Sequence, residues 1–238
     1  MNVKIAALTD IGGRNNNDDT VSERQKDGSS WVFVGDGLGG YAGGQMASEA
    51  AAKALMDASH KGSLLLDSRM QEAANAANEA VLAVQREKRG NMKTTMVFLT
   101  IEDGRAKWMH VGDSRLYHFH GGHLMTQTKD HSVSQMAVLM GEITPQQIRF
   151  HEDRNRVLRA LGSDSAKPEI SQTVMLTGGE DVFLLCTDGF WEYVYEEEME
   201  NQLQRSKTPE QWLDAMKQIL LTRIPQDNDN FTAAAVFC

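Results

Sequence analysis

Four aspartates lie where apolar runs meet glycine turns or polar loops. Asp36, Asp113 and Asp188 each follow such a run, and Asp229 comes just before one. A carboxylate at a strand end, with glycine allowing a sharp backbone turn, is a common way to direct oxygens into one cleft. Several carboxylates cannot stay close together and ionised without a cation between them. The pattern therefore predicts a metal site with hard oxygen ligands, which favour Mg²⁺ or Mn²⁺ over Zn²⁺.

Each motif has a simpler interpretation when it is taken alone. Residues 37–42 superficially fit the GxGxxG/A pattern of dinucleotide-binding proteins, but Asp36 would repel a pyrophosphate. Residues 227–230 resemble the start of a calcium loop, but the glycine and the distal glutamate of that loop are absent. Asp36 could also be only a helix cap, and an Asp-Asn pair is usually a turn. A metal role becomes credible only when the aspartates are taken together.

A polar loop, residues 14–19, follows the first predicted strand. Arg14 offers a planar fork of donors that suits a phosphate group. Asp18 and Asp19 could orient water bound to a metal. The alternative is a solvated loop without a function, because six consecutive polar residues are typical of one.

Composition limits the class of protein. The chain has 238 residues, 41% of them hydrophobic, and a formal net charge of -9 with a pI near 5.3. The acidic balance argues against nonspecific binding to nucleic acid or to an anionic membrane. Two cysteines outside any CxxC motif give no disulfide framework, and Cys186 is expected to be a small buried hydrophobic residue.

No apolar run approaches the length of a membrane span, and the first residues do not resemble a signal peptide. We therefore expect a cytoplasmic protein. No linker divides the sequence, so residues 1–238 are expected to form one domain. Residues 133–160 contain short helical pieces, Pro145 and a charged cluster. We expect this segment to extend from the core and not to form part of it.

Hydrophobic periodicity predicts strands and helices in alternating groups. The predicted strands are 2–9, 31–36, 95–102, 105–112, 114–119, 123–128, 169–176, 181–187 and 231–238. Helices are predicted at 43–60, at 67–89 with Asp67 or Ser68 as N-cap, and at 208–222 with Thr208 as N-cap. Glycine turns at 102–104 and 120–122 predict hairpins, so the fold class is α+β, with antiparallel sheets covered by helices.

Three histidines flank the second hairpin turn: His118, His120 and His123. His118 and His120 share one face of their strand. They could bind a transition metal, but we expect them to be solvated hairpin residues.

The motifs, taken in order, resemble those of the metal-dependent serine/threonine protein phosphatases of the phosphatase 2C type, and the compact bacterial members most closely. The resemblance covers nearly the whole chain and rests on seven motifs: Arg14-x-x-Asn17-Asp18-Asp19, Asp36-Gly37-x-Gly39-Gly40, Gly112-Asp113-Ser114-Arg115, Asp130-His131-Ser132, Arg159-Ala160-Leu161-Gly162, Thr187-Asp188-Gly189 and Asp229-Asn230-x-Thr232. It implies a four-layer α-β-β-α sandwich, in which helix pairs flank two antiparallel sheets, with residues 133–158 as a mobile flap beside the active site.

The resemblance also implies the metal ligands. Asp36 bridges two ions, and the carbonyl oxygen of Gly37 ligates the first of them. Asp188 and Asp229 complete the second. Asp113, together with Asp188, holds a weaker third ion. For Asp113 the alternative is a carboxylate that only stabilises its turn.

Other implied roles surround these ligands. Asp18 and Asp19 act through water, Asn230 is placed beside the metal ligands, and Arg14 grips the substrate phosphate. Arg14, Asp19 and Asp36 are thus the implied catalytic residues.

The implied activity is the hydrolysis of phosphoserine and phosphothreonine in proteins by a metal-activated water, which reverses a Ser/Thr kinase. Its cofactors are two core Mn²⁺ or Mg²⁺ ions and a weaker third. Its partners are phosphorylated proteins, with a cognate kinase or its targets, and the enzyme is expected to be a monomer. The alternatives are a metal-dependent phosphatase of small phosphoesters and a non-catalytic regulatory module on the same fold.

Some positions depart from the family pattern. Leu38 stands where animal members carry a histidine thought to be the general acid, and leucine has no proton to donate. His131 is a candidate substitute, but a structural hydrogen-bonding role is expected for it. Asp18 replaces a longer Glu or Gln, and Lys93 occupies a position where glycine is common.

Overall fold

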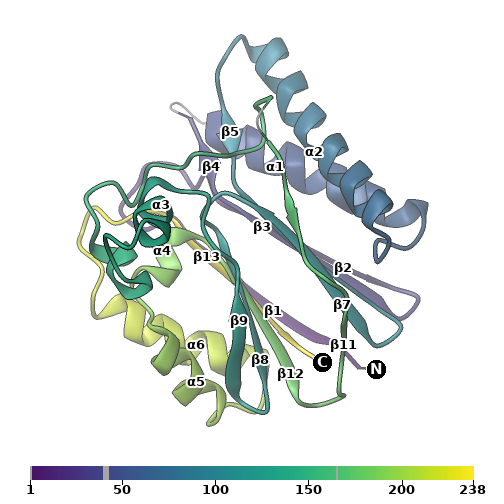
Figure 1. Ribbon diagram of the computed structural model, residues 1–238, viewed down its shortest axis with the longest axis vertical. Coiled ribbons are helices and arrows are strands. Elements are labelled where there is room, and N and C mark those ends of the chain that lie inside the picture. Colours follow the sequence, from purple (N-terminus) through teal and green to yellow (C-terminus); the bar gives the residue numbers. More distant parts are fainter. Residues whose placement is uncertain (1, 40–42, 165) are drawn as a thin grey trace.

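The computed structural model describes residues 2–39, 43–164 and 166–238. Gly40, Tyr41 and Ala42, which complete the glycine motif, lie outside the described residues. Two antiparallel sheets stack face to face, and a pair of helices covers the outer face of each (Figure 1). The predicted four-layer α+β sandwich is therefore confirmed.

Each sheet is assembled from antiparallel neighbours. One has the strand order β1 (Lys4–Asp10), β13 (Phe231–Phe237), β12 (Asp181–Cys186), β8 (Arg115–His120) and β9 (His123–Gln127). The other has the order β10 (Glu169–Ile170), β7 (Arg105–Val111), β6 (Met96–Glu102), β3 (Ser29–Gly35) and β2 (Thr20–Lys26), with β11 (Val174–Met175) also paired to β7. β4 (Gly37–Leu38) and β5 (Lys93–Thr94) form a separate small pair.

Helices lie on both outer faces. α1 (Gly43–Ala58) and α2 (Asp67–Lys88) pack on the sheet that contains β3, with η1 (Ser59–Lys61) after α1. α5 (Glu196–Leu203) and α6 (Pro209–Leu221) pack on the sheet that contains β12. The short α4 (Asp188–Trp191) follows β12, while α3 (Val133–Leu139) and η2 (Pro145–Phe150) belong to the excursion after β9.

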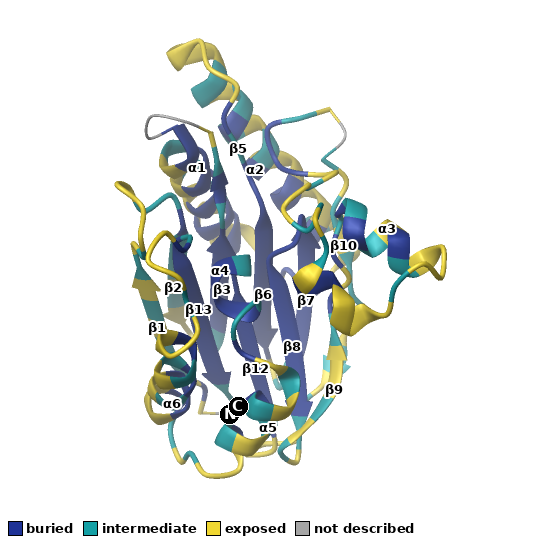
Figure 2. Cartoon of the chain, turned by 90° about the vertical axis from the view of Figure 1, so that its left-hand side faces the viewer, coloured by how far each residue is buried: buried dark blue, intermediate teal, exposed yellow. Residues whose placement is uncertain are grey.

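The alternation of side chains along the strands explains the layers. In β3, Val32 and Val34 pack between the sheets, and Phe33 packs under α1 and α2. In β12, Phe183 packs between the sheets and Leu184 packs under α5 and α6. Figure 2 shows the result, with buried residues on the central strands and on the inner faces of the helices.

Most predicted elements are present, with corrections at weakly patterned segments. β2 and α5 were not predicted, because the sequence of β2 is polar and α5 is short and rich in glutamate. The predicted strand 169–176 is two short strands on β7. Thr208 caps α6 as predicted by accepting a hydrogen bond from the Gln211 amide. The predicted N-cap of α2 is wrong, because that helix begins at Asp67 and Leu66 precedes it without a side-chain cap.

Burial confirms one expectation and corrects another. Cys186 is fully buried, as predicted. His118 is only 6% exposed, so the expectation that it is solvated is wrong. Its ring stacks on Phe183, whose centroid lies 4.5 Å away. Across residues 2–39, 43–164 and 166–238, none of the helices has the length and apolar character that crossing a bilayer requires.

Tight backbone packing fixes the turn that carries Asp188. A Cβ added at Gly189 would lie 2.0 Å from the Asn230 carbonyl oxygen, whereas Gly178 has nothing within 4 Å. We expect Gly189→Ala to lower the free energy of unfolding by about 2 kcal/mol or more and Gly178→Ala to change it by less than about 1 kcal/mol. Urea denaturation of both variants beside wild type measures the difference. Equal stability of the two variants would contradict this packing.

Candidate metal centre

The predicted aspartates meet at one end of the sandwich. Asp36 follows β3, Asp188 follows β12 and Asp229 precedes β13. Burial and the charges of Asp188, Asp19, Asp113 and Asp229 raise the pKa of Asp36 well above its ordinary value. The structure therefore brings together the carboxylates that the sequence separates by as much as 210 positions.

Threonines hold the Asp36 turn from the neighbouring strand. The Asp36 amide donates to Thr95 Oγ1 at 2.8 Å, and Thr94 Oγ1 donates to the Asp36 carbonyl oxygen at 2.9 Å. The Gly37 amide donates to the Asp18 carbonyl oxygen at 3.1 Å, and a Cβ at Gly37 would lie 2.2 Å from the Gly44 carbonyl oxygen. Only glycine fits at this close approach of two backbones.

Asp19 is buried close enough to Asp36 for its charge to raise the pKa of Asp36. Thr187 Oγ1 donates to Asp19 Oδ2 at 2.8 Å, and the Thr232 amide donates to Thr187 Oγ1 at 3.0 Å. Burial raises the pKa of Asp19 to about 7, although hydrogen bonds from Thr232 and Thr187 oppose the rise. Burial, followed by the charge of Asp113, likewise raises the pKa of Asp188.

Arg14 forms a bidentate ion pair with Asp229. Its Nε donates to Asp229 Oδ1 at 3.1 Å and its Nη2 donates to Oδ2 at 3.0 Å. Both side chains are about half exposed. The fork of donors expected for a phosphate therefore lies within the site, where it binds an anionic side chain.

Asn230 and Asp18 fasten the polar loop to the site. Asn230 Nδ2 donates to the carbonyl oxygens of Ile11 and Asn16, and its Oδ1 accepts from the Asp18 amide at 2.8 Å. The Asp18 carboxylate accepts from the Gln45 amide at the start of α1, at 3.2 Å. Asn230 thus positions the loop, and Asp18 joins the loop to α1.

Asp113 is buried and incompletely bonded. It is 2% exposed, and its Oδ1 is buried without a hydrogen-bond partner in the described part of the chain. Burial, followed by the charge of Asp130, raises its pKa to about 7. Its carbonyl oxygen accepts from Trp191 Nε1 at 2.9 Å.

These observations fit hard divalent cations. The site offers carboxylate oxygens, one of them a buried acceptor without a partner among the described residues, and the mutual repulsion of the carboxylates would be relieved by positive charge. Asp36, Asp188, Asp229 and Asp113 supply carboxylates at this end of the fold, and the charges of Asp113 and Asp229 raise the pKa of Asp36 and of Asp188.

Sequence reasoning missed a further acidic side chain. Glu192 lies one turn after Asp188, and its charge helps to raise the pKa of Asp188. Burial raises the pKa of Glu192 itself, and Arg154 Nε donates to its Oε1 at 3.0 Å. The spacing of four residues from Asp188, one helical turn, was the available signal.

His131 supports the turn before Asp113. Its Nδ1 accepts from the Gly112 amide at 3.1 Å, and its own amide donates to the Gly112 carbonyl oxygen at 2.8 Å. Burial, followed by the charge of His110, lowers its pKa to about 4. A neutral ring that accepts from the backbone favours the structural role expected from the sequence.

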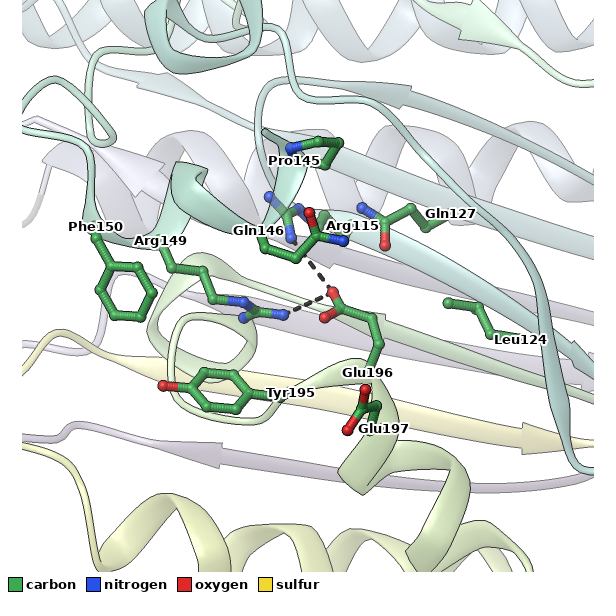
Figure 3. Close-up of a pocket in the computed structure, with 10 residues that line it drawn as sticks. All are labelled: Arg115, Leu124, Gln127, Pro145, Gln146, Arg149, Phe150, Tyr195, Glu196 and Glu197. Carbon is green, nitrogen blue, oxygen red and sulfur yellow. Dashed lines mark hydrogen bonds and ion pairs between the residues drawn. The ribbon is translucent and has the colours of Figure 1, made fainter. Parts of the chain in front are cut away.

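The excursion after β9 folds back on the core beside the site. A pocket of about 480 Å³ lies there. Figure 3 shows that Arg149 and Arg115 face Glu196 in it. Arg149 Nη2 lies 2.6 Å from Glu196 Oε1, and Ile148 joins the core cluster under α5 and α6. These contacts attach η2 to the sheet that contains β12 and to α5.

The raised pKa values predict how pH affects the metal-free protein. Asp19 and Asp113 each change from an ordinary 3.8 to a folded pKa of about 7. A raised acid pKa stabilises the fold below pH 3.8, and this contribution is lost as the pH rises through about 7. We expect the metal-free melting temperature to fall between pH 5 and pH 8, by the equivalent of roughly 3 kcal/mol for each of the two groups, and Mg²⁺ to reverse the loss.

Thermal melts in a chelator and in Mg²⁺ test this expectation. Asp113→Asn should flatten the slope of the metal-free protein, and Asp27→Asn, at a side chain that is 88% exposed, should leave it unchanged. A metal-free melting temperature that rises toward pH 8 would show that the carboxylates do not repel one another.

Known proteins share this sequence pattern. The family model of protein phosphatase 2C matches residues 11–229. The serine/threonine protein phosphatase PstP of Mycobacterium tuberculosis is 33% identical over 208 residues, which are 85% of this chain and 39% of that protein. The chain thus spans about two fifths of the length of PstP. The serine/threonine phosphatase stp of Listeria monocytogenes is 35% identical over 190 residues, which are 77% of this chain and 75% of that protein.

Solved structures share the fold. The crystal structure of PstP/Ppp from Mycobacterium tuberculosis has a TM-score of 0.86 at 30% identity, covering 99% of this chain and 98% of that chain. The catalytic domain of PstP in complex with two manganese ions has a TM-score of 0.83 at 30% identity, covering 99% of this chain and 97% of that chain. With its fold, its gathered aspartates and a family match over residues 11–229, the chain belongs to the protein phosphatase 2C family.

Proposed function

We propose that this protein hydrolyses phosphoserine and phosphothreonine in proteins with the aid of Mn²⁺ or Mg²⁺. The observation that carries the proposal is the gathering of buried, mutually repelling aspartates beside Arg14. Bound divalent cations lower the pKa of water and neutralise charge on a transferred phosphoryl group. The manganese-bound PstP catalytic domain supports the same choice of ion.

Each side chain has a proposed part. Asp36, with the carbonyl oxygen of Gly37, and Asp188 and Asp229 hold two core ions. Asp113 holds a weaker third with Asp188. These roles are supported by the raised pKa of Asp36 and by the Oδ1 of Asp113, which has no hydrogen-bond partner in residues 2–39, 43–164 and 166–238.

The remaining residues orient water and substrate. Asp19, held by Thr187, and Asp18 orient water near the ions, and Asn230 keeps their loop in place. Arg14 exchanges the Asp229 carboxylate for the substrate phosphate, to which its parallel N–H groups can donate in the same way.

We also propose a domain organisation, an oligomeric state and a cellular location for the protein. The chain is one catalytic domain in which residues 133–160 form a flap over the substrate, attached through Arg149 and Glu196. It acts as a monomer in the cytoplasm on the targets of a Ser/Thr kinase, in signalling. Light scattering and cell fractionation test the last two points.

The direct test compares two substrates with and without Mn²⁺. A phosphoserine peptide should be hydrolysed in Mn²⁺ and not in a chelator, and faster than a sugar phosphate. Preference for the sugar phosphate would favour the small-phosphoester alternative. Ion binding without turnover of either substrate would favour a regulatory module.

Asp188→Asn separates catalysis from folding. The substitution removes one buried charge from the repelling group, so the metal-free melting temperature should stay level or rise. Turnover in saturating Mn²⁺ should fall by at least about a hundredfold, because an ion ligand is lost. Near-wild-type turnover in saturating Mn²⁺ would remove Asp188 from the metal site.

Arg14→Ala should act on substrate binding. The KM for phosphopeptide should rise roughly tenfold or more with the loss of a charge-assisted pair of hydrogen bonds. Mn²⁺ affinity, measured by calorimetry, should stay level or increase, because Asp229 loses its competing cation. Arg14→Lys keeps the charge without the fork and should be intermediate. Loss of Mn²⁺ binding with an unchanged KM would assign Arg14 to the ion site instead.

A further inference from the structure

Trp191 connects the turn that carries Asp113 to the helical turn that carries Asp188. Its indole Nε1 donates a hydrogen bond to the Asp113 carbonyl oxygen at 2.9 Å. Trp191 is buried and lies in α4, three residues after Asp188. Because α4 is a single turn of helix, the hydrogen bond from Trp191 also fixes Asp113 relative to Asp188. These two carboxylates are the ones proposed to hold the weaker third ion.

A guanidinium group keeps the indole in this position. Arg115 follows Asp113 by two residues, and its Cζ lies 3.4 Å from the centroid of the Trp191 ring. Arg115 is only 2% exposed and donates to both carboxylate oxygens of Asp130, each at 2.8 Å. A cation over the face of an indole is attracted to the electrons of the ring. The ring therefore cannot turn away from the Asp113 carbonyl oxygen without losing its contact with Arg115.

Other side chains hold the residues on either side of Asp113. Ser114 Oγ lies 2.7 Å from Thr95 Oγ1, and His131 forms hydrogen bonds with both backbone groups of Gly112. The backbone of the turn is thus fixed, whereas Asp113 Oδ1 has no hydrogen-bond partner within the described part of the chain. A firmly held backbone around a free buried acceptor is the arrangement that a preorganised ion ligand requires.

We propose that Trp191 is a positioning residue, which sets Asp113 for the weaker third ion. The inference rests on the proposed function, in which Asp113 and Asp188 hold that ion. Trp191 acts through Asp113, because its hydrogen bond fixes the carbonyl group and with it the side chain on the same Cα. Removal of a group that orients a metal ligand typically weakens metal binding by about tenfold to a hundredfold.

Trp212 offers a matched control in the layer formed by α5 and α6. It is fully buried, and its Nε1 donates to the Met199 carbonyl oxygen at 2.9 Å. Trp212→Phe therefore removes the same atoms as Trp191→Phe, together with a hydrogen bond of the same kind and length. The comparison separates the loss of a large buried ring from the loss of the bond to Asp113.

Mn²⁺ binding tests the proposal without using activity. Calorimetry starts from protein whose two core sites are already filled and follows the weaker ion. Trp191→Phe should weaken binding of that ion by about tenfold or more, Asp113→Ala should abolish it, and Trp212→Phe should leave it unchanged. In phosphopeptide hydrolysis, Trp191→Phe should need about tenfold more Mn²⁺ for half-maximal turnover, while the KM for phosphopeptide stays unchanged.

Thermal melts separate positioning from folding. Trp191→Phe and Trp212→Phe should both lower the melting temperature, because each loses packing and a buried hydrogen bond. Replacement of Trp191 with benzothienylalanine keeps the shape of the ring and removes its N–H group. This second variant should also weaken the third ion, and it tests the hydrogen bond even where Trp191→Phe does not fold.

Three results would overturn the proposal: wild-type affinity for the weaker ion in the Trp191 variants, an equal loss of affinity in Trp212→Phe, or retention of that ion in Asp113→Ala. A different result would contradict the proposed function. Ion binding that follows the expected pattern, in a wild-type protein that does not hydrolyse phosphopeptide, would support the positioning role of Trp191 and refute the phosphatase activity.

Discussion

Repulsion among buried carboxylates at one end of the sandwich is the constraint on which the rest of the site depends. Burial and four neighbouring aspartates raise the pKa of Asp36. A fold can tolerate such a group only by protonation, by pairing or by a bound cation. The metal-free protein uses the first two, because Asp19 and Asp113 have pKa values of about 7 and Asp229 is paired with Arg14. Metal ions would replace both.

This repulsion explains why uncharged threonines, and not lysines, form hydrogen bonds around the aspartates. Thr94, Thr95, Thr187 and Thr232 donate or accept hydrogen bonds at the turns without adding charge. A lysine in their place would neutralise a carboxylate permanently and would compete with an ion. Arg14 differs because it is about half exposed, so its ion pair with Asp229 contributes little to stability.

The sequence predicts those parts that depend on strong local patterns. Apolar runs bounded by glycine turns or polar loops identified β3, β6, β7, β12 and β13 and, with them, the aspartates at their ends. Polar β2 and glutamate-rich α5 carry no such pattern, because tertiary pairing and packing make them regular. The pairing of Arg14 with Asp229 joins positions 215 apart, and no local spacing encodes it.

The burial of His118 likewise depends on residues that are distant in the sequence. Its burial follows from Phe183 and Asp181 on a neighbouring strand, so a hairpin position alone could not predict it. β12 begins with Asp181, beside His118 and His120, and is followed by Asp188 at the aspartate centre, about 20 Å away at the rise of a strand. The charges that most raise the pKa of Asp188 are those of Asp113, Glu192, Asp229 and Asp19, all at the aspartate end of the strands. One strand thus carries two carboxylates in different environments: Asp181 accepts hydrogen bonds from both imidazoles, whereas Asp188 is surrounded by other acids.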